Sequence, residues 1–347
     1  MHVAHKPHNA WPVIAARAYP VASKAVTGVD FDNGFYFSPN TVVVRGGGDI
    51  ATGVIQKLWR AGLHILVLET ARPLTIRRTV ALSSCMYEGV YRVEDMTAVR
   101  ISSPEECGGL WERGLIPALA DPHARSLDFI KPAAVVDAII AKRNMGTHRG
   151  MAPLTIALGP GFSAPEDVDC VIETMRGHSL GRVITKGAAL PNTGIPGEMG
   201  GKSAERVVHS PASGLVRHIR ALGDAVTEGE ALFTVGGVVV RSPLSGTLRG
   251  LIAEGLEIRK ELKCADIDPR PAETVDYLTI SDKARAVGGA VLEAWCMMAG
   301  EKKMLPATTQ YARAPFKQGT GAVTRMAAQL AGQTTGQTTG QTAGRAV

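Results

Sequence analysis

The sequence lacks the features that would place it among secreted, metal-clustered or membrane proteins. Its five cysteines are widely spaced and form no C-x-x-C pair, so neither a disulfide framework nor a zinc or iron–sulfur cage is indicated. No apolar run approaches the roughly 20 residues of a membrane-spanning helix. We therefore expect a cytoplasmic protein that is neither secreted nor inserted into a membrane.

The distribution of charge argues against a nucleic-acid partner. The formal net charge is +6 over 347 residues, but the excess lies in residues 1–40 and 301–347, and the middle of the chain is neutral. A surface that follows nucleic-acid phosphates needs basic residues gathered on a folded face. With 45% hydrophobic residues, the chain is long enough for two domains, each with its own core.

Both ends lack the pattern of a folded domain. Residues 1–40 contain four prolines and are predicted to form an irregular arm. The arm carries His2, His5 and His8, but no second shell is expected to orient them, so no metal site is predicted. Residues 301–347 form a basic tail whose GQTT repeats contain no bulky apolar residue, and they are predicted to be disordered.

The pattern of residues 41–69 is typical of a dinucleotide-binding unit. A β-branched strand, a glycine turn, an amphipathic helix and a second apolar strand follow one another. Gly46 permits the tight turn, Gly48 lets a pyrophosphate approach the backbone, and Ala51 lets helix and strand pack closely. The cofactor-binding residues predicted in this unit are Gly46, Gly47, Gly48, Asp49, Ala51 and Glu69.

The acidic residue of this unit favours one class of nucleotide. Glu69 ends the second strand, where a carboxylate accepts hydrogen bonds from a ribose diol and repels a 2′-phosphate, which favours NAD over NADP. Arg77 or Arg78 is a candidate for a phosphate contact, and solvation or pairing with Glu69 is the alternative. Asp49 either contacts the ligand or caps the following helix.

A second glycine loop is expected at the same edge of the sheet. Gly159 and Gly161 follow an apolar strand, and the residues after them suit a helix that begins at Ser163 and ends before Gly177. The carboxyl ends of parallel strands meet at one edge, so both loops are expected to line one cleft. Two acids in the first turn of this helix favour a cation or a neutral group there over an anion.

Three residues are candidates for chemistry. His178 titrates near neutrality and Glu173 lies close to it in sequence, so the pair is a candidate for acid–base work, with a satisfied polar cluster as the alternative. On a complete helix, His178 would lie roughly 18 Å from the glycine loop at about 1.5 Å per residue. Cys85 is either a sulfur or selenium carrier or an inert buried thiol.

Residues 206–270 contain an internal repeat. SPASGLV at 210–216 returns as SPLSGTL at 242–248, so two similar β-rich halves are expected to pack on each other. The pattern resembles the barrel-sandwich hybrid fold of biotinyl and lipoyl domains. The hairpin between the halves has no lysine to carry such a group, which favours a structural or docking module. In one departure from the repeat, Glu261 stands where the first half has Gly229.

Six segments of unusual sequence occur in consistent order between residues 41 and 295. They are RGGGDIATG (45–53), IRRTVALS (76–83), GPGFSAPEDVDCVIETMRGHSLGRVI (159–184), NTGIPG (192–197), DIDPR (266–270) and SDKARAVGGAVLEA (281–294). Together they resemble the selenium-dependent molybdenum hydroxylase system proteins of the YqeB type. The resemblance implies an accessory role in molybdenum cofactor maturation, with a hydroxylase subunit or another maturation protein as partner. The first unit is also similar to the Rossmann domain of xanthine dehydrogenase maturation factors.

The predicted fold is α/β, with a Rossmann-like parallel sheet, a barrel-sandwich hybrid-like module and a C-terminal helix. The boundaries are an arm at 1–40, the α/β domain at 41–205, the β-rich module at 206–270, the C-terminal helix unit at 271–300 and the tail at 301–347. The helix of the C-terminal unit is predicted to begin at Ser281, where Asp282 in the first turn complements the helix dipole. The predicted function is maturation or cofactor delivery, with a dinucleotide, the molybdenum cofactor or NAD bound at the glycine loop. The alternatives are an NAD-dependent oxidoreductase that uses His178 or Glu173, and an assembly scaffold without catalysis.

Overall fold

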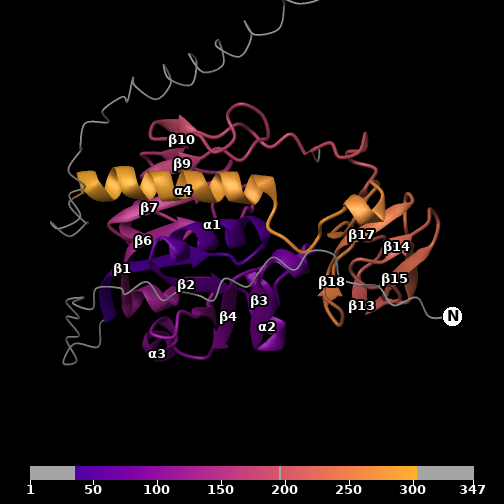
Figure 1. The fold of residues 1–347 in the computed structure, drawn as a ribbon, viewed down its shortest axis with the longest axis horizontal. Helices are drawn as coiled ribbons and strands as arrows, with labels where there is room; N and C mark the ends of the chain where they lie inside the picture. Colours follow the sequence, from indigo (N-terminus) through magenta and orange to yellow (C-terminus); the bar gives the residue numbers. More distant parts are fainter. Residues whose placement is uncertain (1–35, 195–196, 303–347) are drawn as a thin grey trace, which may run out of the picture. The chain divides into compact units, whose positions relative to one another are not determined.

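The computed structural model of the chain describes residues 36–194 and 197–302, which form a mixed α/β fold with a C-terminal helix (Figure 1). The three histidines of the arm and the GQTT tail lie outside the described residues. The arm was predicted to extend to residue 40, but residues 36–40 belong to the first strand, Tyr36–Arg45. No helix in residues 36–194 or 197–302 is long and apolar enough to cross a membrane.

The largest sheet has nine strands in the order β10-β9-β7-β6-β1-β2-β5-β4-β3. Its inner strands pair in parallel, whereas β3 and β10 pair antiparallel at the two edges. The strands are β1 (Tyr36–Arg45), β2 (His64–Glu69), β3 (Val90–Val93), β4 (Met96–Ile101), β5 (Ile116–Ala120), β6 (Ile130–Asp137), β7 (Leu154–Leu158), β9 (Cys170–Ile172) and β10 (Val183–Ile184). A separate two-stranded ribbon joins β8 (Ser163–Ala164) and β11 (Gly187–Ala188).

The strand order reverses next to β1. The chain passes from β1 to β2 on one side and returns later to place β6 on the other side. Three consecutive valines, Val42, Val43 and Val44, are buried because β1 is covered on both faces, as a central parallel strand requires. Open parallel sheets bind their ligands beyond the carboxyl ends of the strands, at such a reversal. The predicted glycine turn directly follows β1 and therefore lies at this position.

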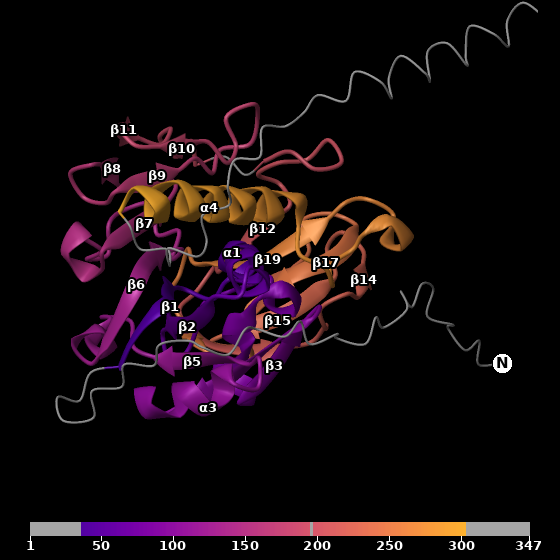
Figure 2. The same ribbon diagram turned by 60° about the vertical axis from the view of Figure 1, so that its left-hand side comes forward.

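In the described part of the chain, four α-helices accompany the sheet: α1 (Asp49–Arg60), α2 (Cys85–Glu88), α3 (Cys107–Trp111) and α4 (Asp282–Glu301). The start of α4 was predicted correctly, because the Ser281 hydroxyl caps the helix by accepting a hydrogen bond from the Ala284 amide at 3.2 Å. Figures 1 and 2 show α1 and α4 side by side, and α4 also packs on β7, β9 and β10.

Two glycines let α1 and α4 approach closely. A Cβ atom placed on Gly53 would lie 2.3 Å from the carbonyl oxygen of Ala284, and one on Gly288 would lie 2.3 Å from the carbonyl oxygen of Gly53. No real Cβ contact is that short, so the two backbones touch only because both positions lack a side chain. The helix that follows the glycine turn is thereby fixed to the C-terminal helix.

We expect Gly288→Ala to lower the free energy of unfolding by about 1–3 kcal/mol, because the new methyl group must push the two helices apart. Gly289→Ala is the matched control, since a Cβ atom at that neighbouring position meets nothing within 4 Å. The control should be neutral or stabilising by up to about 1 kcal/mol, through better helix propensity. Denaturant unfolding of both variants tests the packing, and equal effects would contradict it.

The helix predicted after the second glycine loop is wrong. The chain instead forms β8, a turn and the strand β9, in which Cys170, Val171 and Ile172 are all buried. A short apolar run that is fully buried shows the same residue pattern in a helix and in a parallel strand. The periodicity of its hydrophobic residues therefore does not distinguish the two. The Ser163 hydroxyl does not cap a helix and pairs with Glu166 at 2.9 Å.

Residues 207–268 form two four-stranded sheets that share one core. One sheet has the order β12-β19-β17-β14 and the other the order β16-β15-β13-β18. The strands are β12 (Val207–His209), β13 (Gly214–His218), β14 (Ala225–Val226), β15 (Ala231–Val235), β16 (Val238–Arg241), β17 (Gly246–Leu251), β18 (Glu257–Ile258) and β19 (Lys263–Asp268). We call this pair of sheets the β-sandwich.

The sequence repeat maps the first sheet of the β-sandwich onto the second, strand by strand. Its hydrogen bonds are also duplicated: Gly223 N donates to Leu248 O at 2.9 Å, and the equivalent Gly255 N donates to Val216 O at 3.0 Å. Glu261, the departure noted in the sequence, keeps the turn of its counterpart, because it adopts a positive φ of 65°.

Candidate functional site

A cavity of about 1430 Å³ lies beyond the carboxyl ends of the parallel strands. Five neighbouring strands each deliver residues to its wall. The contributors are Gly46 and Gly48 after β1, Glu69 of β2, Ala138 after β6, Pro160 after β7, and Glu173 to Arg176 after β9. Both glycine loops thus line one cavity, as the shared-edge argument predicts.

The opposite wall of the cavity comes from the β-sandwich and from α4. The side chains on that wall carry many charges; they include Arg206, His209, Arg249, Lys263, Asp266, Arg270, Asp282 and Lys283. Sequence reasoning did not single out any of these residues as functional. The DIDPR and SDKAR segments drew attention only as marks of a resemblance, because nothing local indicates that two distant segments face one cavity.

The three glycines of the first loop have different roles. Gly46 has a φ of +97°, and a Cβ atom there would lie 3.0 Å from the carbonyl oxygen of Ala138. A Cβ atom on Gly47 would lie 3.1 Å from the amide nitrogen of Ser83. On Gly48 it would meet only the Thr75 hydroxyl, at 3.7 Å. Gly46 and Gly47 therefore serve the packing of the turn, whereas Gly48 faces open space in the cavity.

The first turn of α1 is open to an anion. Gly48 occupies the N-cap position, and no side chain caps the helix. The first amides of a helix have no acceptor within it and carry the positive end of the helix dipole. Asp49 and Ala51 both line the cavity at this turn. Asp49 makes no hydrogen bond or ion pair among residues 36–194 and 197–302, so it does not cap the helix with its side chain.

Glu69 supports the turn in addition to lining the cavity. Its carboxylate accepts hydrogen bonds from the Gly47 amide at 3.3 Å and from the Thr70 amide at 3.0 Å. Burial raises the pKa of Glu69, and the two backbone hydrogen bonds oppose that rise. A carboxylate with free lone pairs thus stands at the end of β2, where a ribose diol would lie in a dinucleotide complex.

The sequence did not predict a role for Arg45, the buried residue that precedes the glycine turn. Arg45 ends β1 and donates to the Thr147 hydroxyl at 2.5 Å and to the carbonyl oxygen of Pro122 at 2.9 Å. Thr147 in turn donates to Asp137, the last residue of β6, at 2.6 Å. These contacts tie together the ends of the two strands that flank the reversal of strand order.

The second loop contributes less than the first. A Cβ atom on Gly159 would lie 2.6 Å from the Thr174 hydroxyl, and one on Gly161 would lie 2.6 Å from Cα of Arg143. Both glycines are therefore required by packing, and only Pro160 of this loop lines the cavity. A direct role of Gly159 and Gly161 in ligand binding has no support in these contacts.

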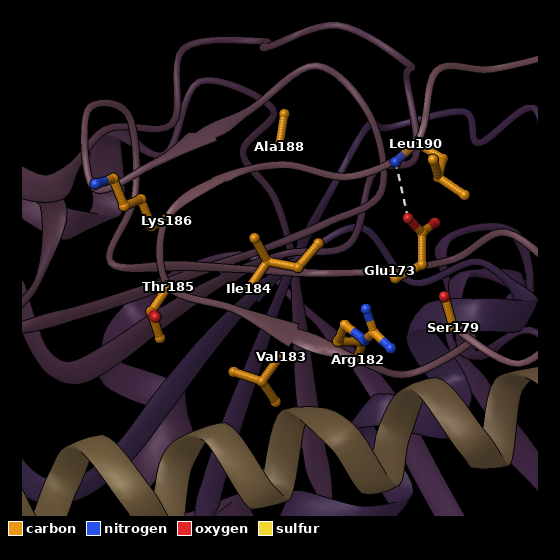
Figure 3. Close-up of a pocket in the computed structure, with 9 residues that line it drawn as sticks. All are labelled: Glu173, Ser179, Arg182, Val183, Ile184, Thr185, Lys186, Ala188 and Leu190. Carbon is orange, nitrogen blue, oxygen red and sulfur yellow. Dashed lines mark hydrogen bonds between the residues drawn. The ribbon is translucent and has the colours of Figure 1, made fainter.

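Glu173 and His178 do not form a pair. Glu173 is 2% exposed, and its two carboxylate oxygens accept hydrogen bonds from the Met175 amide at 2.7 Å and the Leu190 amide at 2.8 Å. Figure 3 shows the bond to Leu190 at the edge of a smaller pocket of about 450 Å³. His178 lies exposed in a turn and lines neither cavity. Glu173 therefore holds two segments of backbone together.

Arg77 and Arg78 lie in different surroundings. Arg78 donates from Nε to the carbonyl oxygen of Leu251 at 2.8 Å and so joins the loop after β2 to the β-sandwich. Arg77 lines the cavity, and its Nε atom is buried without a hydrogen-bond partner. Of the two candidates, only Arg77 lines the cavity.

Cys85 is an inert thiol. It is fully buried, and burial, together with the nearby charge of Glu69, raises its pKa to about 12. A thiol that stays protonated is neither a nucleophile nor a sulfur carrier. The chemistry that the sequence left open for Cys85 therefore has no structural support.

We expect a thiol-alkylating reagent to modify Cys296 in the native protein and to leave the other four cysteines intact. Cys296 is exposed, whereas Cys85, Cys107, Cys170 and Cys264 are buried, and burial raises the pKa of each buried thiol to about 12. Intact mass spectrometry should find one adduct in the native protein and five after denaturation. Modification of Cys85 at the rate of Cys296 would contradict its burial.

Comparison with known proteins gives one strong similarity. The chain is 49% identical over 257 residues to an uncharacterized protein, YqeB, from Escherichia coli strain K12. The match covers 74% of this chain and 47% of that protein, so the chain spans about half the length of the curated relative. No protein-family model matches the chain.

Similarity to solved structures is weak. A succinylglutamate desuccinylase from Silicibacter sp. TM1040 is 14% identical, with a TM-score of 0.20, over 66% of this chain and 84% of that one. The product-bound ectoine utilization protein EutE (DoeB) from Ruegeria pomeroyi is 14% identical, with a TM-score of 0.18, over 66% of this chain and 57% of that one. At such TM-scores, neither structure informs the site.

Proposed function

Because the chain is a homologue of YqeB over most of its own length, we propose that it is an accessory factor that binds a dinucleotide form of the molybdenum cofactor for a molybdenum hydroxylase. The single observation that carries the dinucleotide part is the open space over Gly48 at the uncapped start of α1. The molybdenum part, and any use of selenium, rests on the six segments that resemble the YqeB type.

The same proposal interprets the nine-stranded sheet as Rossmann-like and the β-sandwich as a barrel-sandwich hybrid. The reversal of strand order beside β1 and the glycine turn after it support the first interpretation. The duplicated four-stranded sheets support the second.

In this proposal the chain binds the ligand along the carboxyl edge of the sheet. The free amides of the first turn of α1 hold the pyrophosphate, and Glu69 accepts hydrogen bonds from the ribose diol. Arg77, whose Nε atom lacks a partner, faces the phosphates. The β-sandwich supplies charged residues to the opposite wall of the cavity.

An NAD-dependent oxidoreductase is less well supported. Such an enzyme needs a proton carrier near the nicotinamide, and the candidates were Glu173 and His178. Glu173 is occupied by two backbone amides, and His178 lies outside the cavity. Binding and hand-over of the ligand, without catalysis, agrees better with these positions.

The test is to identify what the full chain carries when it is isolated from its native host. Denaturation should release a pterin dinucleotide near one equivalent, and elemental analysis of the same sample should find molybdenum. Calorimetric titration of ligand-free protein with NAD then asks whether the site takes an ordinary dinucleotide as well. Protein that carries no nucleotide, binds no NAD and still copurifies with a hydroxylase would replace this proposal with an assembly scaffold.

A further inference from the structure

Three cationic side chains of the cavity wall have no hydrogen-bond or ion-pair partner among the described residues. Arg77 lies in the loop after β2, Lys263 begins β19 of the β-sandwich, and Lys283 lies in the first turn of α4. None of their charged groups makes a hydrogen bond or ion pair with residues 36–194 or 197–302. Three segments that are distant in sequence thus bring unpaired positive charge to one space.

The other arginines of the cavity wall are paired. Arg176 forms an ion pair with Asp282 at 2.9 Å, and Arg270 forms one with Asp268 at 2.7 Å. The remaining two, Arg206 and Arg249, both pair with Asp266. The unpaired state of Arg77 therefore distinguishes it from the other arginines of the wall.

One carboxylate acts on all three cations. Burial lowers the pKa of Arg77, Lys263 and Lys283, and the charge of Asp49 at the start of α1 opposes that shift in each case. Asp266 also acts on Arg77 and Lys263, and Glu173 and Asp282 act on Lys283, but none of these carboxylates forms an ion pair with the three cations. Three cations without an ion pair thus lie in the same cavity as the uncapped helix start. Partly desolvated charges without partners are costly, so an anion that enters this space recovers interaction energy.

We propose that Arg77, Lys263 and Lys283, together with the first turn of α1, form one subsite for a pyrophosphate group. The inference rests on the proposed function, because the glycine turn supplies one wall of the subsite. It adds that the β-sandwich takes part in recognition through Lys263 and that the C-terminal helix does so through Lys283. A bound pyrophosphate then links the sheet, the β-sandwich and α4.

The probe is inorganic pyrophosphate, titrated calorimetrically into the full chain. We expect wild-type protein to bind it, and Lys263→Gln and Lys283→Gln each to weaken binding by about tenfold or more. Lys260→Gln is the matched control. It removes the same charge from a lysine three positions before Lys263 that is exposed as Lys263 is but lies outside the cavity, and it should leave the affinity unchanged. Thermal unfolding of each variant checks that the fold is retained.

The outcomes separate this inference from the proposed function. Loss of affinity in both cavity variants, with the control unaffected, supports the subsite, even if NAD fails to bind and the dinucleotide proposal falls. An equal loss in the control would show general attraction by charge and overturn the subsite. Absence of pyrophosphate binding to the wild type, or binding of NAD that is indifferent to both lysines, would also overturn it.

Discussion

Asp266→Asn is expected to lower the free energy of unfolding by about 3–5 kcal/mol, because it leaves buried Arg206 without its counter-charge and leaves Arg249 with Asp268 alone. Asp266 is 2% exposed and pairs through one oxygen with Arg206 and through the other with Arg249, whose Nε lies at 3.0 Å. The two arginines are also buried. Asparagine keeps the shape of the side chain, so the loss reports the charge and not a cavity.

The matched control for this prediction is Asp95→Asn. Asp95 pairs with Arg60 at 2.8 Å, but both side chains are more than 40% exposed, so the loss should stay below about 1 kcal/mol. Denaturant unfolding of the two variants and the wild type gives the comparison. An Asp266→Asn variant as stable as the control would mean that water reaches the arginines.

Gly48→Val is expected to abolish dinucleotide binding while leaving the fold intact. The valine side chain would enter the cavity where the pyrophosphate lies, and its Cβ atom meets only the Thr75 hydroxyl, at 3.7 Å. We expect affinity for NAD, or for the ligand recovered from the native host, to fall on the order of 100-fold, about 2.8 kcal/mol.

The control for this variant is Gly109→Val, at an exposed position in α3 where a Cβ atom has no neighbour within 4 Å. It should bind the ligand as the wild type does. The two proteins should also give similar circular dichroism spectra. Undiminished calorimetric binding by Gly48→Val would remove the glycine turn from the site.

The parts of the fold that were predictable depend on local chemistry. A β-branched strand followed by glycines and an amphipathic helix predicts β1, its turn and α1, and a serine followed by an acid predicts the start of α4. The repeat predicts two similar β-rich halves. In each case the residues that determine the structure lie within a few positions of one another, or recur at a fixed spacing.

The parts that were missed depend on contacts between distant segments. Cys170, Val171 and Ile172 form a strand because β7 accepts them as a neighbour, and no local signal separates that strand from a helix. The wall that carries Lys263 and Lys283 was likewise not predictable, since it exists only where β19 and α4 meet the sheet edge. Of the two candidate arginines, contacts with Leu251 assign Arg78 to packing.

The duplicated β-sandwich has become asymmetric in chemistry while remaining symmetric in backbone. The sheet β12-β19-β17-β14 faces the cavity with Lys263, Asp266 and the preceding residue Arg206, and the repeat places Ala231, Thr234 and Val238 at the matching positions of the other sheet. A copied segment whose two versions differ in this way is what divergence after an internal gene duplication produces. Each sheet takes two strands from each copy, so both copies contribute to the ionic sheet, while the other sheet presents Val238 to solvent at 47% exposure.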